Sequence, residues 1–205
     1  MDAVSNLALL LGGSWASGIR MYATMAGLGI MHRMHLVTLP GDSQVLANPL
    51  IILGAAVLAV VEFAADKIPY FDSVWDSVHT FIRPVGGAAL GYMATSGLGP
   101  VAQVPVAMLC GGAALEAHVA KATARVAINT SPEPVSNIVT STGEDALVVT
   151  ILYFIVRHPV IATIIVIVLI ALTVLLIWAL FKFVKKVFRF FFRKKEEGKP
   201  AAEKK

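Results

Sequence analysis

The sequence predicts an all-α integral membrane protein of about six helices, and three observations favour this fold class. Apolar residues make up 57% of the 205 residues and charged residues only 15%, whereas soluble domains carry about 25% charged residues. Residues 159–181 (PVIATIIVIVLIALTVLLIWALF) contain no charge and exceed the roughly 20 apolar residues that a helix needs to cross a bilayer. Gly and Pro clusters divide the rest of the chain into further apolar segments of helical length.

The first helix is expected over residues 3–31. This segment is apolar apart from Arg20, so that at about 1.5 Å per residue the charge lies near the middle of a membrane helix. Residues 32–47 contain turn formers and polar side chains and predict a loop that either dips back or lies on the surface.

The second and third helices are separated by a proline. Asn48 and Pro49 are typical of the cap and first turn of a helix. Pro69 ends this second helix because proline cannot donate a backbone hydrogen bond. The third helix starts near Phe71 and continues into residues 86–97, before a Gly/Pro hinge.

Three further helices are expected in the second half of the chain. The fourth covers about residues 100–129, a Pro-containing loop follows at 130–135, and the fifth covers 136–156 with a polar first half. His158 and Pro159 begin the sixth helix. We therefore expect one helical membrane domain over residues 1–190.

The C-terminal tail carries most of the positive charge. Ten of the 17 Lys and Arg residues lie at or after Lys182, which explains the net charge of +4 without a nucleic-acid partner. Aromatic and basic residues alternate there, as expected where a helix enters an anionic lipid interface. We expect residues 191–205 to be a disordered basic cytoplasmic tail. The expected lipid-interface residues are Lys185, Lys186, Arg189, Arg193, Lys194 and Lys195.

A weak internal repeat divides the chain into residues 1–98 and 99–190. GGSWASGIRMYAT at 12–24 recurs faintly as GGAALEAHVAKAT at 111–123. Three helices per half would give two inverted repeats, as in many transporters. The distribution of basic residues places both termini in the cytoplasm, and a homo-oligomer is a further expectation.

The motifs of common enzymes are missing from the sequence. It contains no nucleotide-binding loop, no G-x-S-x-G elbow, no H-E-x-x-H pair and no haem or flavin signature. Cys110 is the only cysteine, which excludes an intramolecular disulfide and a thiolate cluster within one chain. We expect no enzymatic activity and no cofactor, and the sequence does not identify a metal.

Charged residues form one stripe of the third expected helix. Asp72, Asp76, His79 and Arg83 are spaced at i, i+4, i+7 and i+11, so they share one face. One interpretation puts this face in the membrane interface with its charges solvated. In another, the stripe faces the bundle beside the acids of the second helix and handles a cation or proton. A structural network of ion pairs is the third interpretation.

Arg20 should face the bundle interior, because a charge in the bilayer core costs a few kcal/mol or more unless it is paired. The candidate partners are Glu62, Glu116 and Asp145. A structural pair that holds helices together is one interpretation, and an anion-binding or charge-compensating residue in a central pathway is the other.

Two segments resemble a known family. SGIRMYA at 17–23 and IPYFDSVWDSVHTFIRPVGGA at 68–88 are similar to a bacterial inner-membrane family classified only as a domain of unknown function. The resemblance covers roughly residues 1–186 and implies location and fold, but no mechanism. The positions that match the family pattern are Arg20, Asp72, Trp75, Asp76, His79, Arg83 and Pro84.

The sequence leaves two functional hypotheses. The first is a small transporter or channel of the bacterial inner membrane for a cation, a proton-coupled solute or a lipid-like substrate. The second is a non-transporting membrane scaffold with a lipid-binding basic tail. For the first hypothesis, the candidate pathway or ion-binding residues are Arg20, Glu62, Asp66, Asp72, Asp76, His79, Arg83 and Glu116.

Overall fold

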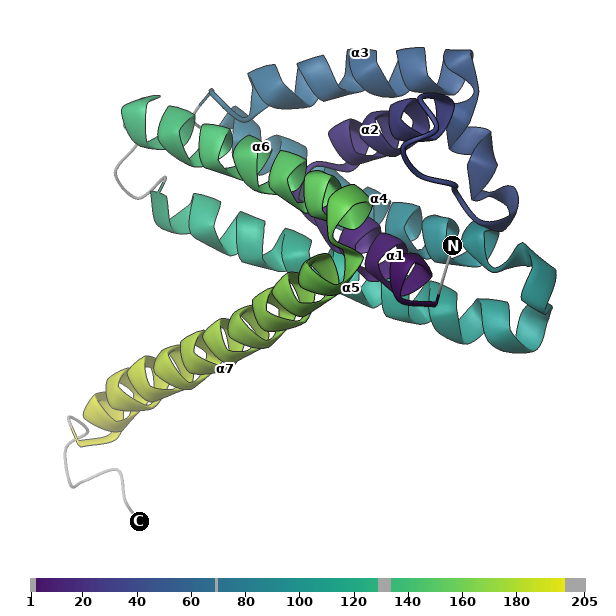
Figure 1. Ribbon diagram of the computed structural model, residues 1–205. Coiled ribbons are helices and arrows are strands. Elements are labelled where there is room, and N and C mark those ends of the chain that lie inside the picture. The colour runs from purple at the N-terminus through teal and green to yellow at the C-terminus, as the bar shows by residue number, and fades with distance from the viewer. Residues whose placement is uncertain (1–2, 69, 129–133, 198–205) are drawn as a thin grey trace.

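The computed structural model describes residues 3–68, 70–128 and 134–197, and the elements found there are all helical. In chain order they are α1 (Ala3–Ile19), α2 (Met21–Arg33), η1 (Gly41–Ala47), α3 (Pro49–Ala65), α4 (Phe71–Ala94), η2 (Ser96–Leu98), α5 (Pro100–Ile128), α6 (Pro134–Arg157) and α7 (Pro159–Glu197), where η denotes a short 3-10 helix (Figure 1). The prediction of an all-α fold is confirmed. The count of about six helices is corrected to seven α-helices in the described residues.

A break at Arg20 accounts for the additional helix. The segment 3–31 was expected to form one helix, but Arg20 adopts φ −138° and ψ 82°, outside the helical region, between α1 and α2. The break frees carbonyl groups at the end of α1, and buried cations hydrogen-bond to two of them. These bonds compensate the break, and they come from helices distant in sequence.

The remaining helices begin close to the predicted positions. The Asn48 side chain caps α3 by accepting a hydrogen bond from the Leu50 backbone N–H at 2.9 Å, with Pro49 at the first helical position. α4 starts at Phe71 and continues through Pro84. The predicted loop at 32–47 contains the short helix η1.

Helix α1 lies at the centre of the fold and packs against α4, α5, α6 and α7 (Figure 1). α4 and α5 lie side by side and run antiparallel, joined through the short η2. α7 packs on the bundle near its start and then leaves it, as Figure 1 shows. The charged face of α4 therefore meets α5 and the end of α1.

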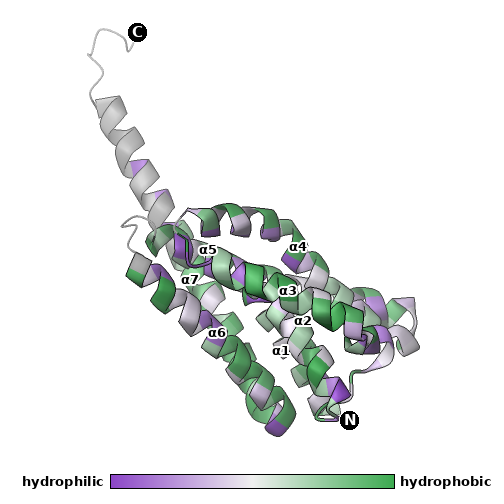
Figure 2. Cartoon of the chain, turned by 90° about the horizontal axis from the view of Figure 1, so that it is seen from above, coloured by the Kyte–Doolittle hydropathy of each residue, from purple (hydrophilic) through white to green (hydrophobic). Residues whose placement is uncertain are grey.

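Charged and large apolar side chains are not distributed as in a typical soluble protein. Large apolar side chains are exposed on α3, α4, α5, α6 and α7, whereas most charged residues of α3, α4 and α5 are buried. In Figure 2, apolar residues predominate along the second half of α6, and polar residues occur in its first half. Exposed apolar and buried charged side chains fit a protein surrounded by lipid.

Three described helices are long and apolar enough to cross a membrane, at Pro100–Ile128, Val135–Arg157 and Pro159–Ala179. A fourth crossing is reached if η1 and α3, which are bent by 68°, count as one broken span. The chain is thus a helical membrane protein. This number is below the count of about six helices that we expected in the membrane domain, because the break at Arg20 shortens the first segment and charges interrupt α4.

Glycines permit very close helix contacts in the core. A Cβ atom at Gly18 would lie 2.2 Å from the Ala114 carbonyl oxygen, and one at Gly87 would lie 2.6 Å from the Ala114 Cβ. Small residues allow such approach in membrane proteins, where apolar burial does not drive helix association. α1, α4 and α5 therefore meet closely just beside the charged residues.

The repeat and the tail differ in part from expectation. The segment 12–24 contains the break at Arg20, whereas 111–123 lies within the continuous helix α5, so the inverted repeat stays a prediction. α7 continues to Glu197, and residues 191–197, expected to be disordered, are helical because strong helix formers extend the segment. Residues 198–205 lie outside the described part of the chain.

Candidate functional site

Ten charged side chains meet inside the bundle around the break between α1 and α2. We call them the charge network. Each takes part in an ion pair with another member, and most are fully buried. The members are the cations Arg20, Arg83, Lys121 and Arg125 and the acids Glu62, Asp66, Asp72, Asp76, Glu144 and Asp145.

The end of α1 attracts two of these cations. The Gly18 carbonyl accepts a hydrogen bond from Arg83 Nη1 at 3.1 Å, and the Ile19 carbonyl accepts one from Lys121 Nζ at 3.3 Å. The C-terminal end of a helix carries a partial negative charge, so the break creates a binding site for cations of α4 and α5. The broken helix and the charge network thus depend on each other.

Arg20 is fully inserted into the network. Its guanidinium pairs with Asp66, lies 2.9 Å from Asp145 Oδ1, and donates to the backbone and side-chain oxygens of Ser141 at 3.0 and 2.8 Å. Glu144 lies 3.4 Å away. Of the partners proposed from the sequence, the structure pairs Arg20 with Asp145 and not with Glu62 or Glu116.

Asp66 is the acid shared by three cations. Besides Arg20, it pairs with Lys121 Nζ at 2.5 Å and lies 3.7 Å from Arg125 Nη2. Burial alone would raise the pKa of Asp66, but Lys121 and Arg20 outweigh burial and hold the pKa below its ordinary value. This carboxylate at the end of α3 therefore stays ionised and ties α3 to α2 and α5.

Arg83 joins α4 to the ends of α1 and α3. Its Nη2 atom lies 2.9 Å from Glu62 Oε1 and 3.2 Å from Asp76 Oδ1, and its Nη1 atom donates to His118 Nδ1 at 2.8 Å. Lys121 Nζ lies 3.6 Å from the same Asp76 oxygen. Asp76 is thus held by cations from two helices through one of its two oxygens.

Arg125 connects α5 to α6. It binds Glu144 through two nitrogens, at 3.2 and 3.0 Å, and donates to the Asp66 backbone carbonyl at 3.0 Å. Asp72 Oδ2 lies 3.8 Å from Arg125 Nη1. This forked arrangement fixes the polar first half of α6 against α5.

Hydrogen bonds orient the two histidines. His79 Nδ1 donates to the Trp75 carbonyl at 2.8 Å, and its Nε2 lies 3.0 Å from the Tyr22 hydroxyl. The Thr80 hydroxyl donates to the Asp76 carbonyl, so His118 Nε2 donates to Thr80 while Nδ1 accepts from Arg83. His118 is therefore neutral, because an arginine can only donate and Nδ1 must accept.

The structure brings seven of the eight candidate pathway residues together. Arg20, Glu62, Asp66, Asp72, Asp76 and Arg83 belong to the network, and His79 flanks it. The interpretation that places the stripe of α4 in the interface with solvated charges is wrong, because Asp72, Asp76, His79 and Arg83 are all buried against the bundle.

Glu116 does not join the other candidates. Its carboxylate accepts a hydrogen bond from the Trp15 indole at 3.0 Å, apart from the ion pairs of the network. Glu116 and Lys121 are five residues apart, which separates them by roughly 140° around an α-helix. Glu116 is therefore removed from the candidate site on structural grounds.

The candidate pathway residues did not include four members of the network, and Asp145 was expected only as a partner of Arg20. The four are Lys121, Arg125, Glu144 and Asp145. His118, Lys121 and Arg125 are spaced at i, i+3 and i+7, so they share one face of α5. This spacing is the signal that could have added Arg125. The pairing with Glu144 depends on how α6 packs on α5, which the sequence pattern does not reveal.

The basic end of α7 is separate from the network. Lys185 and Arg189 are exposed, and Lys182 lies over the Trp178 ring with its Nζ atom 3.5 Å from the ring centre. The side chains of Lys186, Arg193, Lys194 and Lys195 lie outside the described part of the chain. Among the described residues, no group of three His, Cys, Asp or Glu side chains is arranged to hold a metal ion.

The fold and the charge network define a helical membrane protein with a buried polar site at a broken helix. The chain belongs to the family described as a domain of unknown function (DUF4126), whose model matches residues 7–179. The resemblance stated from the two motifs is thus confirmed at the level of the family. Comparison with curated proteins gave no match, and comparison with solved structures gave none either.

Proposed function

We propose that this protein is a small membrane transporter whose polar pathway passes through the charge network. One observation supports this proposal most strongly: ten charged side chains are buried around a helix that is broken inside the bundle. Charges inside a membrane protein are costly and typically mark ion or solute pathways. Broken helices, whose ends carry partial charges, form the binding sites of many transporters.

The composition of the network favours a positively charged or proton-coupled substrate. Six acids surround four cations, so the network has two carboxylates in excess. Lys67 approaches the edge and bonds to the Ser141 hydroxyl at 3.1 Å. Counting it still leaves one excess carboxylate, and an added cation or proton would compensate that charge.

The test is flux into proteoliposomes that contain the purified full-length protein. A pH-sensitive dye inside the vesicles reports proton movement while candidate cations and solutes are added under an imposed pH gradient. We expect flux with the wild type and its loss in D66N, whereas E116Q, which changes an acid outside the network, should keep it. A wild type that moves neither protons nor any member of a broad substrate panel would contradict the proposal.

The proposed location is the bacterial inner membrane with both termini in the cytoplasm, following the distribution of basic residues. Asp42 and Ser96 lie together, because the Asp42 backbone N–H donates to the Ser96 hydroxyl at 3.1 Å. In a C110A background, cysteines at these two exposed or half-exposed positions should react with an impermeant thiol reagent from outside, and V135C from inside. Labelling of Asp42→Cys and Ser96→Cys from the cytoplasmic side would contradict this orientation.

A membrane scaffold with a lipid-binding tail is the alternative, and the exposed Lys185 and Arg189 on the projecting helix α7 favour it. This function predicts no flux and a requirement for anionic lipid. Binding of the detergent-solubilised protein to anionic vesicles would decrease in K185E/R189E. If K185E/R189E lost vesicle binding but kept the flux of the wild type, lipid binding by the tail and transport would be separate functions.

A further inference from the structure

We infer that Asp76 is the residue that takes up a proton, and that the proton reaches it through a polar crevice between α4 and α5. This inference rests on the proposed transport function and names its coupling ion and point of entry. It starts from a carboxylate of the network that combines nearly complete burial with a position on the wall of a cavity.

The crevice has a volume of about 120 Å³, which is room for several water molecules at roughly 30 Å³ each. Its lining residues are Ser73, Asp76, Ser77, Thr80, Ala122, Arg125 and Val126. Ser77 and Val126 are exposed and form its mouth, while Asp76 is only 3% exposed and lies at its inner end. Water can therefore approach this carboxylate without crossing the rest of the network.

Asp76 has an oxygen available for a proton. Within the described residues, neither of its carboxylate oxygens has a hydrogen-bond partner. Oδ1 is held by ion pairs with Arg83 at 3.2 Å and Lys121 at 3.6 Å, and Oδ2 has no ion pair among the described residues. Asp66, by contrast, is bound by three cations.

The donors around the crevice are already committed. The hydroxyls of Ser77 and Thr80 donate to backbone carbonyls of α4, and the Ser73 hydroxyl donates to Asp72. Each nitrogen of Arg125 donates to Glu144 or to the Asp66 carbonyl. The crevice thus offers acceptors to an incoming species, which favours hydronium or another small cation over an anion.

A proton fits this site better than a metal ion. Two cations already lie within 4 Å of Oδ1, and an alkali ion would meet their repulsion with only one free carboxylate oxygen as a strong ligand. In the proton step, the Oδ2–H bond forms and an O–H bond of hydronium breaks, leaving water in the crevice. Asp76 becomes neutral and no other bond changes.

Other titratable and charged groups surround Asp76 on every side. They are Glu62 and Asp66 at the end of α3, Asp72, His79 and Arg83 on α4, His118, Lys121 and Arg125 on α5, Glu144 on α6, and Arg20 and Tyr22 at the break. Protonation of Asp76 would end its ion pairs with Arg83 and Lys121. These two cations also hold the carbonyls at the end of α1, so the proton would act directly on the broken helix.

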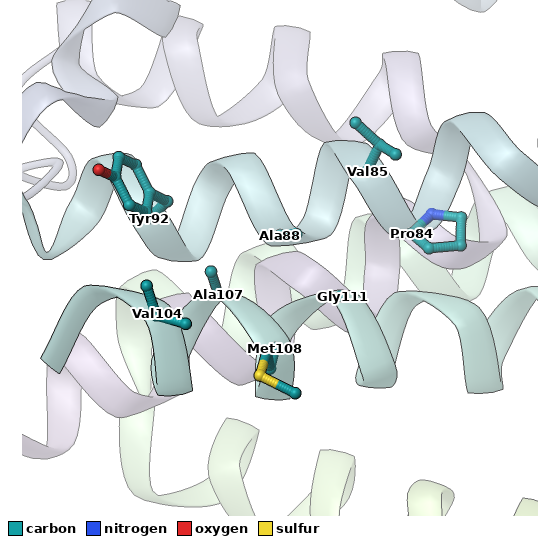
Figure 3. Close-up of a pocket in the computed structure, with 8 residues that line it drawn as sticks. All are labelled: Pro84, Val85, Ala88, Tyr92, Val104, Ala107, Met108 and Gly111. Atoms are coloured by element: carbon teal, nitrogen blue, oxygen red, sulfur yellow. The ribbon is translucent and has the colours of Figure 1, made fainter. Parts of the chain in front are cut away.

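A second groove between α4 and α5 offers a contrast. It has a volume of about 350 Å³ and contains no charged residue (Figure 3). Its lining residues are Pro84, Val85, Ala88, Tyr92, Val104, Ala107, Met108 and Gly111. A proton has no acceptor carboxylate among these lining residues, whereas the crevice at Ser77 has Asp76 on its wall.

The test is a pH titration of protonated carboxyl groups by infrared spectroscopy on the full-length protein in lipid, labelled with 13C at the aspartate carboxyls. We expect a titrating carboxylic-acid band in the wild type that carries the isotope shift. The band should be lost in D76N and kept in D42N, which removes an exposed acid. In D76E the titrating band should remain and lose its isotope shift, which decides the question even if D76N does not fold.

Three outcomes would overturn the inference. They are a titrating aspartate band that persists in D76N, one that keeps its isotope shift in D76E, and a midpoint that moves when sodium replaces choline at constant ionic strength, which would indicate a sodium site.

Modification of S77C in a C110A background should slow the titration, whereas modification of S96C should not. If the Asp76 band titrates in a protein that shows no flux, the proton site stands and the transport proposal fails. If flux is unchanged in D76N, transport stands and the proton site fails.

Discussion

Different interactions hold α4 and α5 together at the two ends of the pair. At one end, the buried face of α4 carries Asp72 and Asp76, which pair with Arg125 and Lys121 of α5. At the other end, the same face continues as Gly87 and Gly91 against Cys110. One helix therefore holds its partner first by charge and then by close backbone contact.

This difference shows how close packing at one end of two helices can fix the positions of charged side chains at the other end. Ion pairs tolerate small shifts in distance. At the end with Gly87 and Gly91, which we call the small-residue end, a Cβ at Gly91 would lie 2.7 Å from Cys110 Sγ, so the two helices have almost no freedom to shift there. Close packing there fixes the position of α4 on α5, and with it the placement of Asp76 beside Arg83 and Lys121.

The largest effect is expected from R20Q at the charged end. Removing one member of a buried ion pair leaves the other charge uncompensated, and typically costs about 3–5 kcal/mol. Asp66 and Asp145 would both lose a partner. Reversible unfolding in mixed micelles should show this loss, whereas R33Q, at an exposed arginine, should change the free energy of unfolding by less than about 1 kcal/mol. Equal effects of the two variants would argue against a network that stabilises the fold.

The next effect is expected from G87A at the small-residue end. The added Cβ would lie 2.6 Å from the Ala114 Cβ and 2.8 Å from the Cys110 carbonyl oxygen, and overpacking of this kind costs about 1–3 kcal/mol. G112A is the matched control, since nothing lies within 4 Å of its Cβ. It should stabilise the protein by about 0.5–1 kcal/mol, because alanine favours a helix over glycine. The same unfolding assay checks both signs, and destabilisation by G112A would contradict this account of the packing.

Much of this contrast could be predicted from the sequence. The spacing of Asp72, Asp76, His79 and Arg83 placed them on one face, because the period of a helix is independent of what surrounds it. What the spacing could not decide was whether this face meets water or protein. That depends on α5 and α6, which approach it from distant parts of the sequence.

The break at Arg20 could not be predicted in the same way. Ser17 and Gly18 precede it and weaken a helix, but Gly111 and Gly112 lie inside the continuous helix α5, and no proline marks the position. The cations that bind the freed carbonyls, Arg83 and Lys121, lie far away in sequence. A break that is stabilised by tertiary contacts leaves only a weak local signal. Glu116 was misplaced for a related reason, since it was chosen as a charged partner for Arg20 and not by its helical face.

A smaller effect is expected from acid titration of Asp66. Its pKa lies below the ordinary value of about 4, so its contribution to stability is present above that value and is lost as the pH falls through the lower folded-state value. The melting temperature in detergent should therefore fall below about pH 4 more steeply for the wild type than for D66N. D42N, at an exposed acid, should follow the wild type. A D66N curve as steep as the wild type would mean that other carboxylates control the acid sensitivity.

The smallest effect is expected from E116Q, outside the charge network. Glutamine keeps a carbonyl oxygen that can accept the hydrogen bond of the Trp15 indole, now 3.0 Å long, so the free energy of unfolding should change by less than about 1 kcal/mol. Flux should also persist, because the polar face of α5 consists of His118, Lys121 and Arg125 and not of Glu116. The proteoliposome assay checks this against D66N. If E116Q abolished flux while leaving the fold intact, the pathway would extend along α1 toward α7, and the charged end of the α4–α5 pair would be only one part of it.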